Sequence, residues 1–195
     1  EPFLDMKRNP SMEAIRLLEG MEYNGYEVVI EEMPMKYAEV RDIIRGLVDK
    51  HQPAAVICTG VSSIATDIPV ERVAINVGSA DGRVNFGYER LDQALNPDGP
   101  TAYWSTLPVR EIVEKIKDEG IPAHISNSAG TQGCNLVFYH LMDYIAEKNL
   151  GIPGGFIHVP RLPENAVGSR NPSMSLLDSA KALEIAADLT ASKLP

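Results

Sequence analysis

The chain has 195 residues, of which 44% are hydrophobic and 23% charged, and its formal net charge is −9. This length fits one domain with a sizeable hydrophobic core. The negative charge argues against nucleic acid and anionic membranes as partners, because both repel an acidic surface. No apolar run reaches the roughly 18 residues of a membrane span, no signal peptide is visible, and the two cysteines lie far apart. We therefore expect a cytoplasmic protein without a disulfide framework.

Helix-like and strand-like segments alternate along the chain. Helical spacing or helix start signals occur at residues 10–19, 36–50, 109–119, 134–148 and 173–193. Strand-like runs occur at residues 26–33, 54–60, 70–77, 122–126 and 154–160, and residues 78–100 read as a loop. This alternation predicts an α/β fold, a three-layer α/β/α sandwich with a largely parallel twisted sheet. We expect residues 1–195 to form one domain, with its ligand at the carboxyl ends of strands.

The stretch "SNSAGTQGCN" places Cys134 where a glycine-rich turn meets a helix. The first turn of a helix has unpaired N–H groups and a partial positive charge, which favour a thiolate and can hold an oxyanion. Cys134 is therefore a candidate nucleophile, although a small apolar residue could also stand at a helix start. Cys58 lies inside an apolar strand and is predicted to be a core residue.

A cysteine nucleophile needs a base, and the chain offers four histidines. His51 ends a polar helix, His124 lies within a strand, and His140 lies on the helix of Cys134 but points elsewhere. His158 lies near the carboxyl end of the strand "GGFIHVP", where site residues belong in this architecture. It is the best candidate, and the alternative is a hydrogen-bonded histidine of the core.

The segment "IPVERVAIN" supplies a possible third group. Strict alternation puts Glu71 on the same face as Val73 and Ile75, and a carboxylate among apolar side chains is costly unless it is paired. Glu71 could form an ion pair with an arginine, or it could accept a hydrogen bond from His158 and hold its tautomer. The spacing leaves both possibilities open.

Several motifs resemble those of the pyroglutamyl peptidases, a family of cysteine peptidases, over nearly the whole chain. They are "EPF" with a later "NP", "VERVAIN", "PTAYWSTLP", "SNSAGTQGCN", "GFIHVPRLPE" and "PSMS". The resemblance implies an α/β/α sandwich that forms a homodimer or homotetramer. It also implies that the first strand of the family precedes Glu1 and is missing from this sequence.

The same resemblance implies roles for individual residues. Cys134 would be the nucleophile, His158 the base and Glu71 the third catalytic member. The enzyme would remove N-terminal pyroglutamate from peptides by acyl transfer through a thioester, without a metal or organic cofactor. Among candidate substrate contacts, Phe3 would form a wall of the pyroglutamyl slot, with Asn76 and Arg83 beside it.

Some segments depart from the family pattern and keep other functions open. Leu4 and Asp5 replace a glycine pair, the loop "GVSSIATDIP" lacks the usual arginine, and "SADGR" matches the family's Asp-Ala-Arg only with a gap at Arg83. One alternative is a phosphorylase-like enzyme that binds an anion or a nucleoside, because "ICTGVSS" is a strand followed by a loop of small residues. Another is a non-catalytic binding protein on a peptidase scaffold.

Overall fold

The computed structural model describes residues 6, 8–34, 36–81 and 89–195. The helices are α1 (Pro10–Arg16), α2 (Val40–His51), α3 (Val109–Asp118), α4 (Gly133–Lys148), α5 (Pro163–Ala166) and α6 (Leu176–Ala191). The strands are β1 (Glu22–Tyr23), β2 (Tyr26–Glu27), β3 (Val56–Val61), β4 (Ile68–Glu71), β5 (Val73–Ile75), β6 (Gly78–Asp81), β7 (Glu89–Gln93), β8 (Ala102–Trp104), β9 (Ala123–Ser126) and β10 (Gly154–Val159). None of the described helices is long and apolar enough to cross a membrane.

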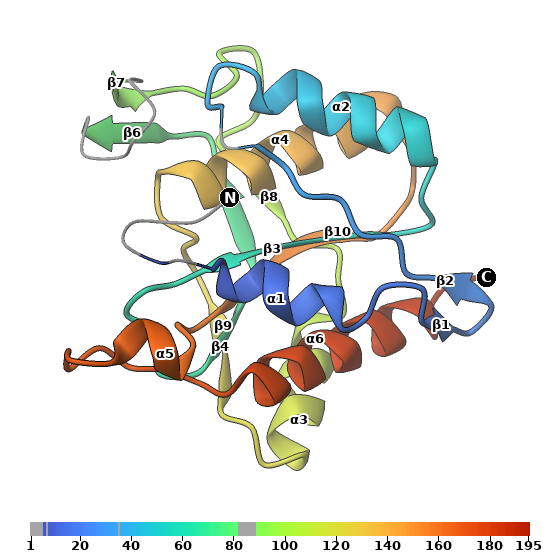
Figure 1. The fold of residues 1–195 in the computed structure, drawn as a ribbon. Coiled ribbons are helices and arrows are strands. Elements are labelled where there is room, and N and C mark those ends of the chain that lie inside the picture. The colour runs from blue at the N-terminus through green and yellow to red at the C-terminus, as the bar shows by residue number, and fades with distance from the viewer. Residues whose placement is uncertain (1–5, 7, 35, 82–88) are drawn as a thin grey trace.

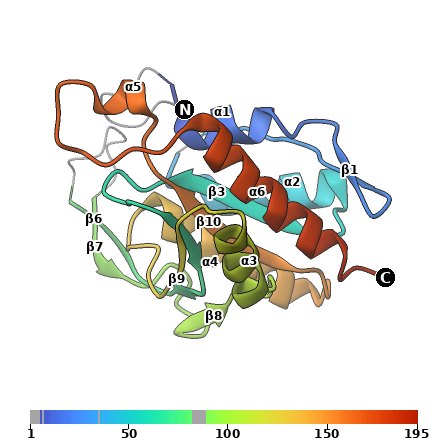
Figure 2. The ribbon, with the colours of Figure 1, turned by 90° about the horizontal axis from the view of Figure 1, so that it is seen from below.

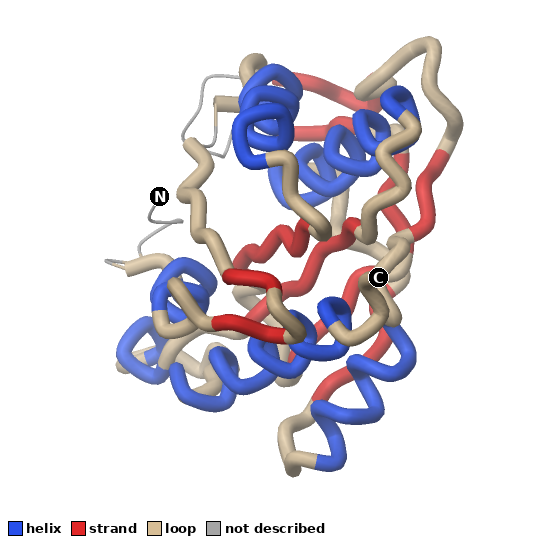
Figure 3. Tube along the Cα trace, turned by 90° about the vertical axis from the view of Figure 1, so that its right-hand side faces the viewer, coloured by secondary structure: helices blue, strands red, loops and turns tan. Residues whose placement is uncertain are grey.

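A central sheet separates two layers of helices. In the part of the chain that the structure describes, its strand order is β3-β10-β4-β9. The pairs β3/β10 and β4/β9 are parallel, and β10/β4 is antiparallel. Helices α2 and α4 cover one face, and α1, α3 and α6 cover the other (Figure 1). Seen from the side, strands run between an upper and a lower group of helices (Figure 3). The predicted α/β fold and largely parallel sheet are thus confirmed.

Two predicted strands are shorter in the structure than in the sequence pattern. The strand expected at 26–33 is limited to Tyr26–Glu27, which pairs with β1 through a turn whose residues Asn24 and Gly25 have positive φ. This geometry is typical of tight hairpins. The strand expected at 70–77 divides into β4 and β5 at Arg72. The N–H of Arg72 still donates to the carbonyl of Ser126 on β9 at 2.9 Å, whereas its carbonyl accepts the N–H of Ser105, so the chain passes here from the central sheet to the β5–β8 sheet.

Helices α1, α3 and α4 begin within one residue of the predicted positions, whereas α2 and α6 begin later than expected, at Val40 and Leu176. The side chain of Asn9 caps α1 by accepting the backbone N–H of Ser11 at 3.0 Å, and Pro10 is the first helical residue. The predicted loop at 78–100 contains the hairpin strands β6 and β7, which are polar and short. A period-2 apolar pattern is absent there, so these strands could not be predicted from the sequence.

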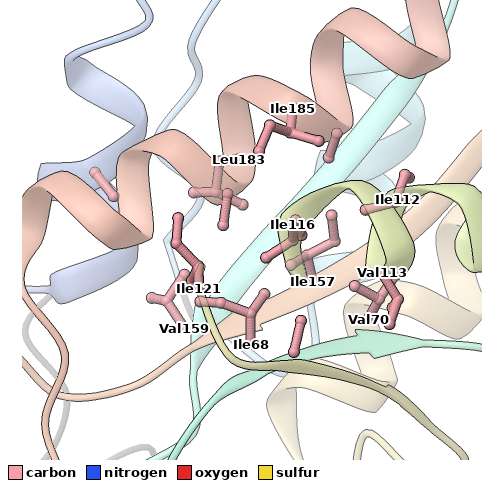
Figure 4. Packing of buried hydrophobic residues seen from close by; sticks show 14 of the residues in the cluster. Ile68, Val70, Ile112, Val113, Ile116, Ile121, Ile157, Val159, Leu183 and Ile185 are labelled. Carbon is pink, nitrogen blue, oxygen red and sulfur yellow. The ribbon is translucent and has the colours of Figure 1, made fainter. Parts of the chain in front are cut away.

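Two hydrophobic clusters fill the layers on either side of the sheet. The first joins apolar residues of β4, β9 and β10 with those of α1, α3 and α6, and Ile68, Ile116 and Ile157 are fully buried in it (Figure 4). Figure 2 views the molecule from this side and shows α3 and α6 in front of the strands. The second cluster joins α2 and α4 with the other face of the sheet. Each buried aliphatic side chain contributes about 1.5–3 kcal/mol, so the strands are held from both faces.

Candidate active site

The register of the central sheet gathers functional side chains on the face covered by α4. On β3 and β10, Gly60 lies opposite His158, and Cys58 lies opposite Phe156. On β10 and β4, Phe156 lies opposite Glu71. Successive side chains of a strand point to opposite faces, so these five residues share one face. The site therefore lies on this face of the sheet. Gly60, His158 and Glu71 are each the last or next-to-last residue of their strands, but β4 runs antiparallel to β10, so these carboxyl ends do not all lie at one edge of the sheet.

Cys134 reaches this face from the turn that follows β9. The side chain of Ser126 accepts the N–H of Ser128 at 3.3 Å, and the side chain of Ser128 accepts the N–H of Gly130 at 3.2 Å. Gly130 has a φ of 80°, which favours glycine. Helix α4 then begins at Gly133, so Cys134 is its second residue and lies in the positive field of the helix N-terminus.

Gly60 allows the cysteine to approach the sheet. A Cβ atom at residue 60 would lie 3.0 Å from Sγ of Cys134 and 2.9 Å from the ring of Phe156. Both distances are shorter than ordinary van der Waals contact, so a side chain at this position would displace the thiol. The sequence interpretation linked "ICTGVSS" to anion binding. The structure instead places Gly60 within β3, against the cysteine.

His158 links Cys134 to Glu71. Its Nδ1 lies 2.8 Å from Oε1 of Glu71, and its imidazole is near enough to Cys134 for the cysteine to raise its pKa. His158 is 6% exposed and Glu71 only 1% exposed, so solvent hardly screens the interaction. The ring of Phe156 packs against the imidazole with a centroid separation of 4.8 Å. Glu71 thus pairs with the histidine, as one of the two sequence hypotheses required.

The charges around His158 favour its protonated form. Burial by itself lowers the pKa of the imidazole, but interactions with Cys134 and Glu71 outweigh burial and raise the pKa to about 9. The imidazole is therefore protonated at neutral pH, between a carboxylate on one side and a cysteine on the other. Oε2 of Glu71 has no hydrogen-bond partner among the described residues, so the pairing with His158 is the main interaction of this carboxylate.

The other cysteine has a different environment. Cys58 is half-buried in β3, and burial, with a smaller effect from Cys134, raises its pKa to about 12. It stays a neutral thiol at physiological pH and is a poor nucleophile. Cys58 packs against the cluster under α2 and α4 but also lines the cavity, so it lies at the edge of the core rather than inside it as the sequence predicted.

The remaining histidines have partners away from Cys134. His51, predicted to be solvated, is half-buried and pairs with Glu31 at 2.6 Å. His124 is exposed and pairs with Asp67 at 2.8 Å. His140 is buried on α4. The structure therefore places only His158, among the four histidines, beside both Cys134 and Glu71.

Of the three predicted substrate contacts, only Asn76 lies among the described residues. Phe3 and Arg83 lie outside the described residues. The amide of Asn76 is engaged elsewhere: its Nδ2 donates to the carbonyl of Asn96 at 2.7 Å, and its Oδ1 accepts the N–H of Asn96 at 2.9 Å. The role of these three residues in substrate binding stays a prediction.

A large cavity opens in front of Cys134. Its volume is about 1380 Å³, and its walls include Tyr37, Gly60, Cys134 and His158. The cavity also extends along β3 toward Leu183 and Leu194, so only part of this volume lies beside the thiol. The sequence did not predict Tyr37, Gly60 and Phe156 as site residues. Of the three, only Gly60, at the end of an apolar strand, stood out in the sequence, and there it was associated with anion binding.

Among the described residues, no group of three or more His, Cys, Asp or Glu side chains could hold a metal ion.

Known proteins are similar to this chain over nearly its full length. A family model described as pyroglutamyl peptidase matches residues 1–193. The pyrrolidone-carboxylate peptidase of Bacillus subtilis is 42% identical over 187 residues, which cover 96% of this chain and 87% of the relative. The crystal structure of pyroglutamyl peptidase I from Bacillus amyloliquefaciens is 41% identical, has a TM-score of 0.94, and is matched over 98% of this chain and 93% of that one. A mutant pyrrolidone carboxyl peptidase from Pyrococcus furiosus is 32% identical with a TM-score of 0.93, over 99% of this chain and 95% of that one.

Proposed function

The chain belongs to the pyroglutamyl peptidase family, and from this premise we propose that Cys134, His158 and Glu71 are the catalytic residues of a cysteine peptidase that removes N-terminal pyroglutamate. The observation that carries the assignment is the buried His158, which bonds to Glu71 at 2.8 Å and whose pKa is raised by interaction with Cys134 as well as with Glu71. The phosphorylase-like and binding-only alternatives have no support from the comparisons.

The first step is attack by the cysteine. Sγ of Cys134 bonds to the carbonyl carbon that follows the pyroglutamyl ring, and the C–N bond of the scissile amide breaks. The protonated His158 donates its proton to the leaving amine, which departs as the shortened peptide. Its raised pKa, to about 9, keeps that proton available at neutral pH. Glu71 stabilises the imidazolium and orients the ring.

The second step releases pyroglutamic acid. Water attacks the thioester, His158 accepts a proton from it, and the C–S bond breaks to restore the thiolate. The first intrahelical bond of α4 runs from the N–H of Leu136 to the carbonyl of Gln132 at 2.9 Å. The N–H groups of Cys134 and Asn135 precede that bond and lie in the first turn of the helix, where they can stabilise the oxyanion.

The substrate has no charge at its amino end, because the lactam closes on its own nitrogen. A pocket that fits this ring needs apolar walls and a few hydrogen bonds to the lactam amide. A prolyl ring has a similar shape, but it carries an ammonium group and lacks the lactam carbonyl. Its binding would bury a charge and leave hydrogen-bonding groups of the pocket unpaired.

The test is an assay on amides with one fluorogenic leaving group. We expect hydrolysis of the pyroglutamyl amide, and a kcat/KM lower by roughly 10⁴ or more for the prolyl and glutaminyl amides. Equal values for pyroglutamyl and prolyl amides would contradict the assigned specificity. A Cys134→Ala variant that keeps full activity would contradict the assigned nucleophile.

We also propose that the enzyme is a cytoplasmic homo-oligomer and that its residues form one catalytic domain. Both cysteines are free, which fits a reducing compartment. Ile64, Val167 and Leu177 are largely exposed apolar side chains, and such side chains favour contacts between subunits. Light scattering after gel filtration tests this: we expect the mass of two or four chains, and the mass of one chain would contradict it.

A further inference from the structure

The first N–H group of the helix that carries Cys134 has a distant partner. Helix α4 begins at Gly133, and the preceding residue, Gln132, makes no capping bond with its side chain. The N–H of Gly133 instead donates to the hydroxyl of Tyr37 at 3.0 Å. Tyr37 lies 96 residues earlier in the chain, in the segment that leads into α2. A side chain from a distant part of the chain therefore caps this helix.

The opposite side of the same turn is also fixed. Thr131 accepts the N–H of Ser79 on its carbonyl at 2.8 Å, and its hydroxyl donates to the carbonyl of Ser79 at 3.3 Å. These bonds hold the turn to β6, two residues before Gly133. Tyr37 holds the next part of the chain, directly beside the cysteine. The position of Cys134 thus depends on contacts from both sides of the turn.

Tyr37 lies close to the reacting atoms. It is half-buried, packs against the cluster under α2 and α4 as Cys134 does, and lines the cavity in front of the thiol. Burial raises the pKa of its phenol, the bond from Gly133 lowers it, and the charge of Cys134 raises it again. The net effect is a higher pKa, so the hydroxyl stays neutral and accepts the N–H of Gly133 throughout the physiological range.

We propose that Tyr37 is a positioning residue for the nucleophile. By holding Gly133, its hydroxyl fixes the direction in which Cys134 presents Sγ to the substrate. Because Gly133 is already bonded, the oxyanion is received by the next N–H groups, those of Cys134 and Asn135. This inference rests on the proposed function, since it requires Cys134 to be the nucleophile.

The test removes the hydroxyl and keeps the ring. We expect Tyr37→Phe to lower kcat about tenfold and to leave KM within about twofold, because small errors of alignment affect the reaction more than binding. The matched control is Tyr144→Phe. Tyr144 lies near the other end of α4, and its hydroxyl donates to Asp49 at 2.6 Å. We expect this control to change the melting temperature as much as Tyr37→Phe does, with kcat within about twofold of the parent enzyme.

Each outcome separates the two proposals. A kcat of Tyr37→Phe equal to that of the parent, or an equal loss in Tyr144→Phe, would overturn the positioning role. A raised KM with unchanged kcat would also overturn it, since Tyr37 would then be a substrate contact. An active Cys134→Ala variant, measured in parallel, would instead refute the proposed nucleophile. The combination of an inactive Cys134→Ala and a slow Tyr37→Phe with normal KM supports both.

Discussion

The two faces of the central sheet differ more than any other two regions of the molecule, although the same strands build both. On β10, Ile157 points toward α3 and α6 and is fully buried among aliphatic side chains. Its neighbour His158 points toward α4 and bonds to Glu71. On β4, Val70 likewise packs in the aliphatic cluster, whereas the next residue, Glu71, points to the opposite face. One face carries the main aliphatic core, and the other carries the chemistry.

This difference shows how a small fold can hold charged groups in its interior. A buried carboxylate and imidazolium are costly unless each has a partner, and here each partner is supplied by a neighbouring strand. Hydrophobic clusters on both faces hold those strands, so the few polar side chains of the site do not have to contribute much stability. Substitutions on the polar face should therefore affect mainly activity, and those on the apolar face mainly stability.

The largest effect on the polar face should come from Cys134→Ala. We expect kcat/KM for a pyroglutamyl amide to fall by about 10⁴ or more, because the bond-forming group is lost, with little change in melting temperature. Cys58→Ala is the matched control, since it removes the other thiol of the same face and should reduce activity less than tenfold. Iodoacetamide should label Cys134 well before Cys58, whose pKa of about 12 keeps it protonated. First labelling at Cys58 would contradict the assignment.

The next largest effect should come from Glu71→Gln. Glutamine fills the same space but stabilises the imidazolium less, so we expect kcat to fall by about 10²–10³ and less than in Cys134→Ala. Unfolding in denaturant should show that the variant remains folded. If the variant has the same kcat as the parent enzyme, Glu71 does not take part in the mechanism.

The pH profile tests the same interaction. His158 must be protonated to donate to the leaving amine, so kcat/KM of the parent enzyme should fall as pH rises through about 9. Glu71 is one of the groups that raise this pKa, so Glu71→Gln should move the alkaline limb to lower pH. An unchanged limb would show that another group controls it.

Gly60→Ala should have a smaller effect on the same face. The new methyl group would lie 3.0 Å from Sγ of Cys134 and 2.9 Å from the ring of Phe156, so the thiol must move. We expect kcat to fall about 10- to 100-fold, as measured with the fluorogenic amide. Gly46→Ala on α2 is the control, because a Cβ there meets no atom within 4 Å. It should leave kcat unchanged and raise stability slightly, as alanine favours a helix.

On the apolar face the smallest effect on kcat should come from Ile157→Ala. The cavity left in the core should lower the free energy of unfolding by about 2–5 kcal/mol. The folded fraction should keep a kcat within a few-fold of the parent, because Ile157 points away from the cavity that holds Cys134. Denaturant unfolding and kinetics below the transition measure the two quantities separately. A large loss of kcat without loss of stability would contradict the proposed difference between the two faces.

The sequence predicted the fold class and most of the elements, because these depend on local patterns. Short apolar runs marked β3, β9 and β10, and Asn9 with Pro10 marked the start of α1. The divided strand at Arg72 was missed, because a change of sheet leaves no periodic signal. Alternation beyond Arg72 predicted that Val73 and Ile75 share the face of Glu71, but they lie on β5, in a different sheet.

The candidate site depends even more on the tertiary structure than the fold does. The sequence by itself determined which residues could do the chemistry: a cysteine at a helix start, a histidine near the end of a strand, and a glutamate in an apolar run. Only the tertiary structure decided that His158 and Glu71 lie 2.8 Å apart, that Gly60 makes room for the thiol, and that Tyr37 caps the helix. The reason is physical. Residue types and periodicity are local properties, whereas the distance between two side chains depends on strand register and helix packing, which bring together residues as distant in the chain as Tyr37 and Gly133.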